Sequence, residues 1–110
     1  MWIFTNTGFV SAVSDGKDLM VRARDRQSLE PLSIFAKSEI KKTPTHDYPY
    51  RVFVSHELFS KWVSDQATAI QYKNFKSEVS DVRGYEFSKP LMKVWSAMHD
   101  VEDEEARSQR

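Results

Sequence analysis

The chain has 110 residues, with 16 basic and 16 acidic side chains and a formal net charge of zero. Hydrophobic residues make up 40% and charged residues 29%, which is typical of a globular domain. The absence of cysteine excludes disulfides, thiolate nucleophiles and cysteine-based metal sites, and it favours a cytoplasmic location.

The sequence gives no sign of a membrane partner. No apolar run approaches the roughly 18 residues that a membrane helix needs. The first residues, MWIFTNTGFVSAV, lack the basic start and the cleavage site of a signal peptide, and they are typical of a strand instead. We therefore expect no membrane association.

Charge is unevenly distributed along the chain. Residues 100–110 hold five acidic and two basic side chains, so the rest of the chain holds fourteen basic and eleven acidic ones. This excess is too small to predict general nucleic-acid binding, but it allows a local basic patch. We expect a single domain over residues 1–99 and an acidic, disordered tail over residues 100–110, because the tail has no apolar periodicity.

The first part of the chain predicts three strands. Apolar and β-branched runs at 2–5 and 8–13 are separated by a turn sequence at 6–8, which is typical of a hairpin. A second turn sequence at 15–18 leads into a third strand at 19–24. Three short strands joined by turns predict an antiparallel meander.

A helix is predicted next, because Leu29, Leu32 and Ala36 have the spacing of an amphipathic helix. Asp25 is a candidate N-cap for this helix. Proline is tolerated in the first turn but not in the interior, so Pro31 favours a later start, near Ser28.

The middle of the chain predicts a connection, a strand and a helix. Residues 37–50 are polar and are expected to form a long connection with a short strand near Ile40, followed by a strand at 51–54. Ser55 is the candidate cap of the next helix. The apolar stripe of that helix is Leu58, Phe59, Trp62 and Val63.

The last part of the chain predicts a short helix over 72–80, ended by Gly84, and a longer helix that starts at 88–90. The apolar positions of the longer helix are Leu91, Val94, Trp95 and Met98. The predicted fold class is therefore α+β: a small antiparallel sheet of three to four strands with helices packed on one face, in a two-layer sandwich.

Arginines mark one face of the predicted sheet. Arg22 and Arg24 are two residues apart in a strand and share a face, as Arg51 and Phe53 do in another strand. Arginine forks match phosphate and carboxylate oxygens, and an aromatic ring beside them can stack on a base. The alternative is a solvated sheet face, with the arginines paired to Asp18, Asp25 or Asp47.

Two other segments carry polar and aromatic residues. The loop at 43–51 holds His46, Asp47 and Tyr48, which are suited either to acid–base chemistry or to capping and partial burial. In the segment at 71–76, aromatic residues alternate with lysines, as on a nucleic-acid contact surface, or else its rings are core residues and its asparagine caps a helix. The histidines lack metal-ligand spacing, so we predict neither a metal nor a cofactor.

Four segments together resemble a family of small bacterial and phage proteins with no assigned function. They are VRAR at 21–24, TP with DYPYR at 43–51, YKNFK at 72–76 and VWSAM at 94–98, and the resemblance covers residues 1–99. It implies that the polar residues typical of the family form either a ligand site or a structural network. These candidate site residues are Arg22, Arg24, Asp47, Tyr48, Arg51, Tyr72, Asn74 and Lys76.

Three functional hypotheses follow. The first is a non-catalytic binding module whose sheet-face arginines receive a phosphate-bearing ligand, either a nucleotide or a nucleic acid. The second is a regulatory or inhibitor protein of phage type that docks on a larger protein partner or forms a homodimer. The third is an enzyme that uses His46, Asp47 and Tyr48, although the chain has no nucleophile or metal motif; we assign no catalytic residue.

Overall fold

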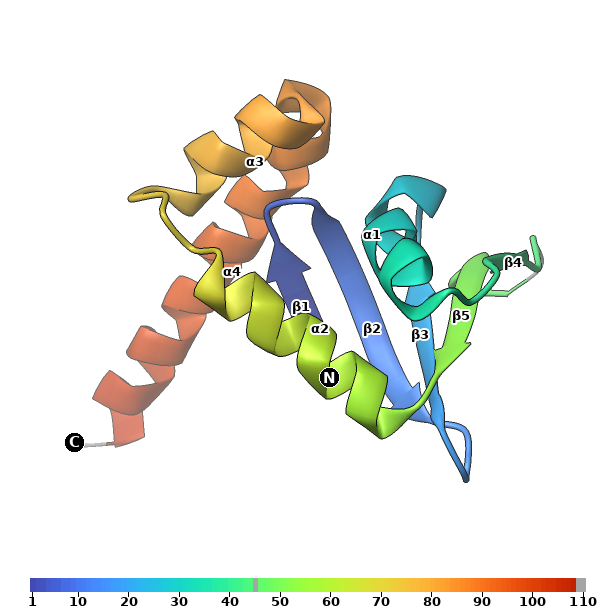
Figure 1. The fold of residues 1–110 in the computed structure, drawn as a ribbon. Helices are drawn as coiled ribbons and strands as arrows, with labels where there is room; N and C mark the ends of the chain where they lie inside the picture. The colour runs from blue at the N-terminus through green and yellow to red at the C-terminus, as the bar shows by residue number, and fades with distance from the viewer. Residues whose placement is uncertain (45, 109–110) are drawn as a thin grey trace. The chain divides into compact units, whose positions relative to one another are not determined.

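The computed structural model describes residues 1–44 and 46–108. Its chain divides into two compact units, Met1–Tyr72 and Lys73–Arg110. Figure 1 labels the elements, which are β1 (Trp2–Thr5), β2 (Gly8–Ser14), β3 (Leu19–Ala23), α1 (Arg26–Ala36), β4 (Lys41–Lys42), β5 (Tyr50–Val54), α2 (His56–Thr68), α3 (Phe75–Arg83) and α4 (Tyr85–Ser108).

The first unit contains an antiparallel sheet with the strand order β1-β2-β3-β5-β4. The α+β class is therefore confirmed, with five strands instead of three to four. The additional strand is β4, which has only two residues and pairs with β5. A short strand was expected near Ile40, and β4 follows directly after that residue.

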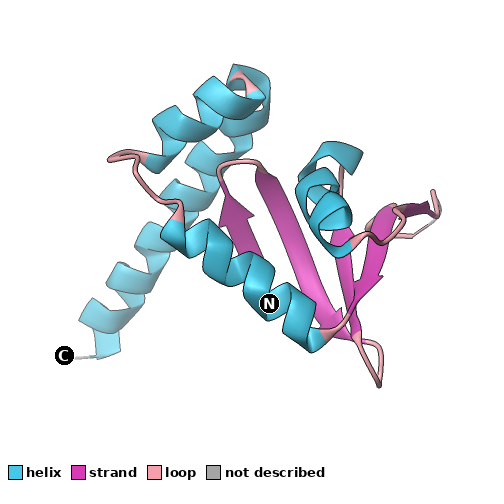
Figure 2. Ribbon diagram, in the orientation of Figure 1, coloured by secondary structure: helices cyan, strands magenta, loops and turns pink. Residues whose placement is uncertain are grey.

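Apolar side chains on alternate strand positions form the core of the first unit. Ala12, Val21 and Val52 are aligned across β2, β3 and β5, and all three are buried. Helix α1 packs against these strands and buries Leu29 and Leu32 completely. Figure 2 shows α1 and α2 over the same sheet, and α2 adds two aromatic residues to this core, Phe59 and Trp62.

Helix α1 begins at Arg26 and contains Pro31, so the predicted start near Ser28 was wrong. The reason is tertiary packing at the first turn. Ser28 is buried against β2, and its Oγ accepts a hydrogen bond from the Phe9 amide at 3.2 Å. This contact holds the helix in place ahead of the proline, whose ring removes only one backbone hydrogen bond.

The predicted turns and caps of the first unit are mostly present. Asp25 occupies the N-cap position of α1, but its side chain makes no capping hydrogen bond. Ser55 Oγ caps α2 by accepting from the Leu58 amide at 3.1 Å. In the β2–β3 turn the amides of Asp18 and Lys17 donate to the Asp15 carboxylate, and these bonds hold its pKa below its usual value.

The second unit consists of α3 and α4. Asn74 caps α3 by accepting from the Ser77 amide at 2.9 Å, and α3 ends before Gly84, as predicted. Helix α4 begins at Tyr85, so the predicted start at 88–90 was wrong, and Pro90 lies within the helix. Gly84 has a φ of 92°, which separates the two helices and lets α4 start directly after it.

Helix α4 continues through residues 100–108, where the sequence predicted a disordered tail; residues 109–110 lie outside the described part. This segment is exposed, and Val101 is the single large apolar residue within 100–108. It is supported instead by side-chain pairs three residues apart, His99–Glu102 at 3.3 Å and Glu104–Arg107 at 2.7 Å. Within residues 1–44 and 46–108, no helix is long and apolar enough to cross a membrane.

The close approach of α1 to β2 depends on Gly8. A Cβ at this position would lie 2.2 Å from Ser28 Oγ and 2.7 Å from Ser28 Cα. We expect Gly8→Ala to lower the free energy of unfolding by at least about 3 kcal/mol, because backbone atoms must move to relieve the overlap. Urea denaturation followed by circular dichroism measures this change.

Gly16→Ala is the control for this prediction. Gly16 has a φ of 104°, but a Cβ there would meet no atom within 4 Å. Its cost is therefore backbone strain alone, about 1 kcal/mol. Equal destabilisation by the two substitutions would contradict the close packing of α1 on β2.

Candidate functional site

The sheet face opposite α1 carries the candidate arginines, and we call it the arginine face. Residues aligned across an antiparallel sheet point to the same side, so the strand register shows which side chains share this face. One row crosses all five strands and consists of Trp2, Ser11, Arg22, Arg51 and Lys41. We call its three cationic members, Arg22, Arg51 and Lys41, the basic row.

Arg22 is held in place by neighbours on both sides. Its Nη2 donates to Ser11 Oγ at 3.0 Å, and its guanidinium carbon lies 4.5 Å from the centroid of the Tyr48 ring. Its Nε is buried and has no hydrogen-bond partner among the described residues. The guanidinium is therefore fixed in orientation, with its Nε turned away from solvent.

Arg24 forms an ion pair with Asp47, as in the alternative prediction of a solvated sheet face with paired arginines. Its Nη1 donates to the Asp47 carboxylate at 3.2 Å and to the Asp47 carbonyl oxygen at 3.0 Å. The two side chains are 58% and 79% exposed, so the ion pair contributes little stability. Arg24 also lies 4.4 Å from the Tyr48 ring.

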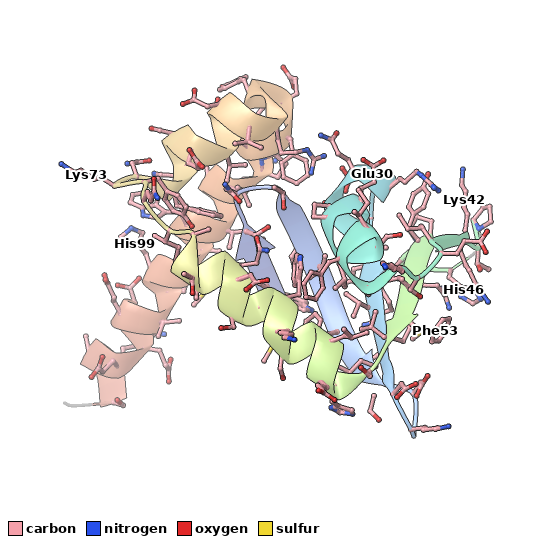
Figure 3. The ribbon with its side chains drawn as sticks, in the orientation of Figure 1. Glu30, Lys42, His46, Phe53, Lys73 and His99 are labelled. Carbon is pink, nitrogen blue, oxygen red and sulfur yellow. The ribbon has the colours of Figure 1, made fainter. Side chains whose placement is uncertain are left out.

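Arg51 ties the β4–β5 loop to the sheet. Its Nη2 donates to the Tyr48 carbonyl oxygen at 3.2 Å and to His46 Nδ1, and its Nη1 points to Met20 Sδ at 3.7 Å. As for Arg22, the Nε of Arg51 is buried without a hydrogen-bond partner in the described part of the chain. Figure 3 shows His46 in this loop, with Lys42 and Phe53 nearby on β4 and β5.

Tyr48 is the centre of the arrangement. Its side chain is only 6% exposed, and both Arg22 and Arg24 lie over its ring. Cation–π contacts of this kind stabilise a buried ring by about 1 kcal/mol each. The Tyr48 ring and three arginines thus fasten the loop to the arginine face. These contacts form a structural network, which was one of the two alternatives predicted from the sequence.

The basic row lacks carboxylate partners. Asp47 pairs with Arg24, whereas no carboxylate of residues 1–44 or 46–108 forms an ion pair with Arg22, Arg51 or Lys41. Like charges directly opposite each other in neighbouring strands destabilise a sheet. Arg22 stands opposite Arg51, and Arg51 stands opposite Lys41. The chain therefore carries a repulsion that a bound anion would remove.

Aromatic residues extend the arginine face, and sequence reasoning did not include most of them in the site. Trp2 and Phe9 make an edge-to-face contact at 5.8 Å, and Phe4 stacks on Phe9 at 4.5 Å. Trp2 is 69% exposed, and Phe53 on β5 is 38% exposed. The spacing of Trp2 and Phe4 in a strand was the available signal, because it places both rings on one face.

The other three predicted site residues have different surroundings. Tyr72 lines a cavity of about 200 Å³ with residues of β1 and α2, such as Ile3 and Val63. Asn74 is the N-cap of α3, and the Nζ of Lys76 lies 4.4 Å from the centroid of the Trp95 ring in the second unit. The structure therefore brings together Arg22, Arg24, Asp47, Tyr48 and Arg51, and it gives local structural contacts to Tyr72, Asn74 and Lys76.

The loop residues considered for acid–base chemistry make docking contacts. His46 accepts from Arg51, Asp47 accepts from Arg24, and the Tyr48 ring is covered by arginines. Among the described residues, no three His, Asp or Glu side chains are grouped so that they could hold a metal ion. What the arrangement offers chemically is a set of oriented cationic donors beside exposed rings.

Comparison with protein-family models, with curated proteins and with solved structures finds no match to this chain. The resemblance carried by the four sequence segments therefore stays a prediction.

The Tyr48 ring contributes to stability, whereas its hydroxyl is expected to contribute little. We expect Tyr48→Ala to lower the free energy of unfolding by about 3 kcal/mol, because it removes a buried ring and both cation–π contacts. Tyr48→Phe keeps the ring and is expected to cost less than about 1 kcal/mol. Thermal denaturation of the two variants tests this, and a large loss in Tyr48→Phe would contradict it.

Proposed function

We propose that this protein is a non-catalytic binding module for a phosphate-bearing ligand, which binds to the arginine face. The observation that carries the proposal is the basic row: three cations on neighbouring strands, none of them in an ion pair among the described residues. Because like charges stand opposite each other in the row, a bound anion would be favoured by the relief of repulsion as well as by direct attraction.

The fixed orientation of the arginines supports the same proposal. Tyr48 and Ser11 hold Arg22, and the Tyr48 carbonyl oxygen holds Arg51. Side chains that are already ordered lose little entropy when they bind, and a planar guanidinium can donate two parallel hydrogen bonds to phosphate oxygens. The Nε atoms of both arginines are buried, so the terminal Nη groups would make those bonds.

Charge-removing substitutions test this proposal. Inorganic tripolyphosphate should shift the amide NMR signals of β3, β4 and β5, because these strands carry the basic row. We expect Arg22→Gln or Lys41→Gln to weaken tripolyphosphate binding by about ten-fold, since each removes one charge-assisted contact. The same titration, repeated at several salt concentrations, should show weaker binding as the salt concentration rises.

Two control substitutions are expected not to weaken tripolyphosphate binding. Lys61→Gln removes an exposed charge from α2 and should leave binding unchanged. Asp47→Asn removes the anion nearest to the arginines and should strengthen binding by a few-fold. Equal affinity in Arg22→Gln, Lys41→Gln and Lys61→Gln would refute the site, as would amide shifts confined to other elements.

A specific observation favours a second candidate, docking on a protein partner. The apolar positions of α4 were expected to pack in a core, yet Val94, Trp95 and Met98 are exposed, and Met98 is 58% exposed. Val94, Met98 and Val101 lie four and three residues apart and so share one side of the helix. An exposed apolar stripe of this kind is common at protein–protein contacts.

Self-association is the simplest form of this second candidate. If two copies associate through α4, we expect sedimentation velocity to show a dimer whose fraction rises with protein concentration. Met98→Glu should shift the equilibrium toward the monomer, because it places a charge in the contact. Ser96→Glu makes the same charge change on the opposite side of α4 and should have no effect. A chain that is monomeric at all concentrations would contradict association of two copies through α4.

A further inference from the structure

The arginine face combines charge with exposed aromatic rings, and this combination narrows the class of ligand. Building on the proposed function, we infer that the ligand is a single-stranded nucleic acid whose phosphates contact the basic row and whose bases stack on Trp2 and Phe53. The position and exposure of the rings and the length of the row support this class of ligand.

Trp2 is positioned as a stacking platform. It belongs to the same cross-strand row as Arg22, with Ser11 between them. Met1, the residue before Trp2, is bonded to β2. The Met1 ammonium donates to the Ala12 carbonyl oxygen, and the Ala12 amide donates to the Met1 carbonyl oxygen, both at 2.8 Å. Trp2 is therefore an exposed ring on an ordered strand, which lowers the entropy lost when a base stacks on it.

Phe53 is the second ring, on the other side of the arginines. It follows Arg51 by two residues in β5 and so lies on the same face, three strands away from Trp2. The Nζ of Lys41 lies 5.8 Å from the centroid of the Phe53 ring. Phe53 thus has a cation of the basic row beside it, and the row's first cation, Arg22, lies two strands from Trp2, as expected where bases and phosphates of one strand bind together.

The length of the row favours a polymer over a mononucleotide. Five strands at the usual spacing span roughly 19 Å between the outer two. A single nucleotide contacts only part of that distance, whereas a strand of several nucleotides can reach both rings and all three cations. The row has a ring at one end and three cations in succession from its middle to its other end, and Phe53 lies two residues from Arg51 in β5, so a flexible strand can place phosphates on the cations and bases on both rings.

The exposed rings favour a single strand over a duplex. Stacking on a side chain requires a base that is unpaired and splayed out, as in single-stranded DNA or RNA. In a duplex the base faces are covered, and affinity then depends on phosphate contacts alone. The small positive excess of residues 1–99 provides little of that general attraction, so the rings must supply part of the affinity.

Fluorescence anisotropy with a labelled oligothymidylate of about a dozen nucleotides tests this inference. The wild-type chain should bind the oligomer, and Trp2→Ala should weaken binding by about ten-fold or more, because one stacked base is lost. Trp95→Ala removes an exposed tryptophan of the second unit and should leave the affinity unchanged. An abasic oligomer of equal length should bind the wild type more weakly, and Trp2→Ala should not weaken it further.

The outcomes separate this inference from the proposal on which it rests. If the abasic oligomer and the oligothymidylate bind equally, or if Trp2→Ala has no effect while Arg22→Gln does, the phosphate site stands and the single-strand inference is overturned. Tighter binding of a duplex of the same length would also overturn it. If no oligomer and no tripolyphosphate binds, the proposed function fails too, and a protein-docking role becomes the better explanation of the exposed residues.

Discussion

The burial of one sheet face by α1 is the constraint on which the rest of the molecule depends. Leu29 and Leu32 are completely buried, together with Val21 and Val52 on the strands below. Strand side chains alternate, so covering these positions leaves the intervening residues on the other face. The positions of the arginines are thus a consequence of the core: a one-residue slip in register would exchange the charged and apolar faces, at a prohibitive cost in buried charge.

The arginines of this face combine two roles that the sequence presented as alternatives. Arg51 fastens the loop through the Tyr48 carbonyl oxygen, and Arg24 does so through Asp47. These contacts use part of each guanidinium, which has five N–H donors. A structural network and an anion site are therefore compatible. The contacts that fasten the loop to the sheet also keep the arginines oriented for a ligand.

Local patterns made the strands and most helices predictable, whereas contacts between distant segments did not appear in the sequence. The alternation of residues 19–24 indicated a strand and its arginine side correctly. The start of α1 was misplaced because Pro31 is a local signal, while the contact of Ser28 with β2 is a tertiary one. The contribution of Trp2 was missed because its register with Arg22 depends on two strand pairings.

The short strand β4 gives the sheet a protected edge. A sheet edge exposes unpaired backbone groups, which invite strands of other molecules, and natural proteins block this by keeping edge strands short and by placing lysines on them. β4 has two residues, and both of them are lysines. Lys41 therefore serves in two ways: its charge discourages the addition of a foreign strand at this edge, and it completes a surface that attracts a polyanion.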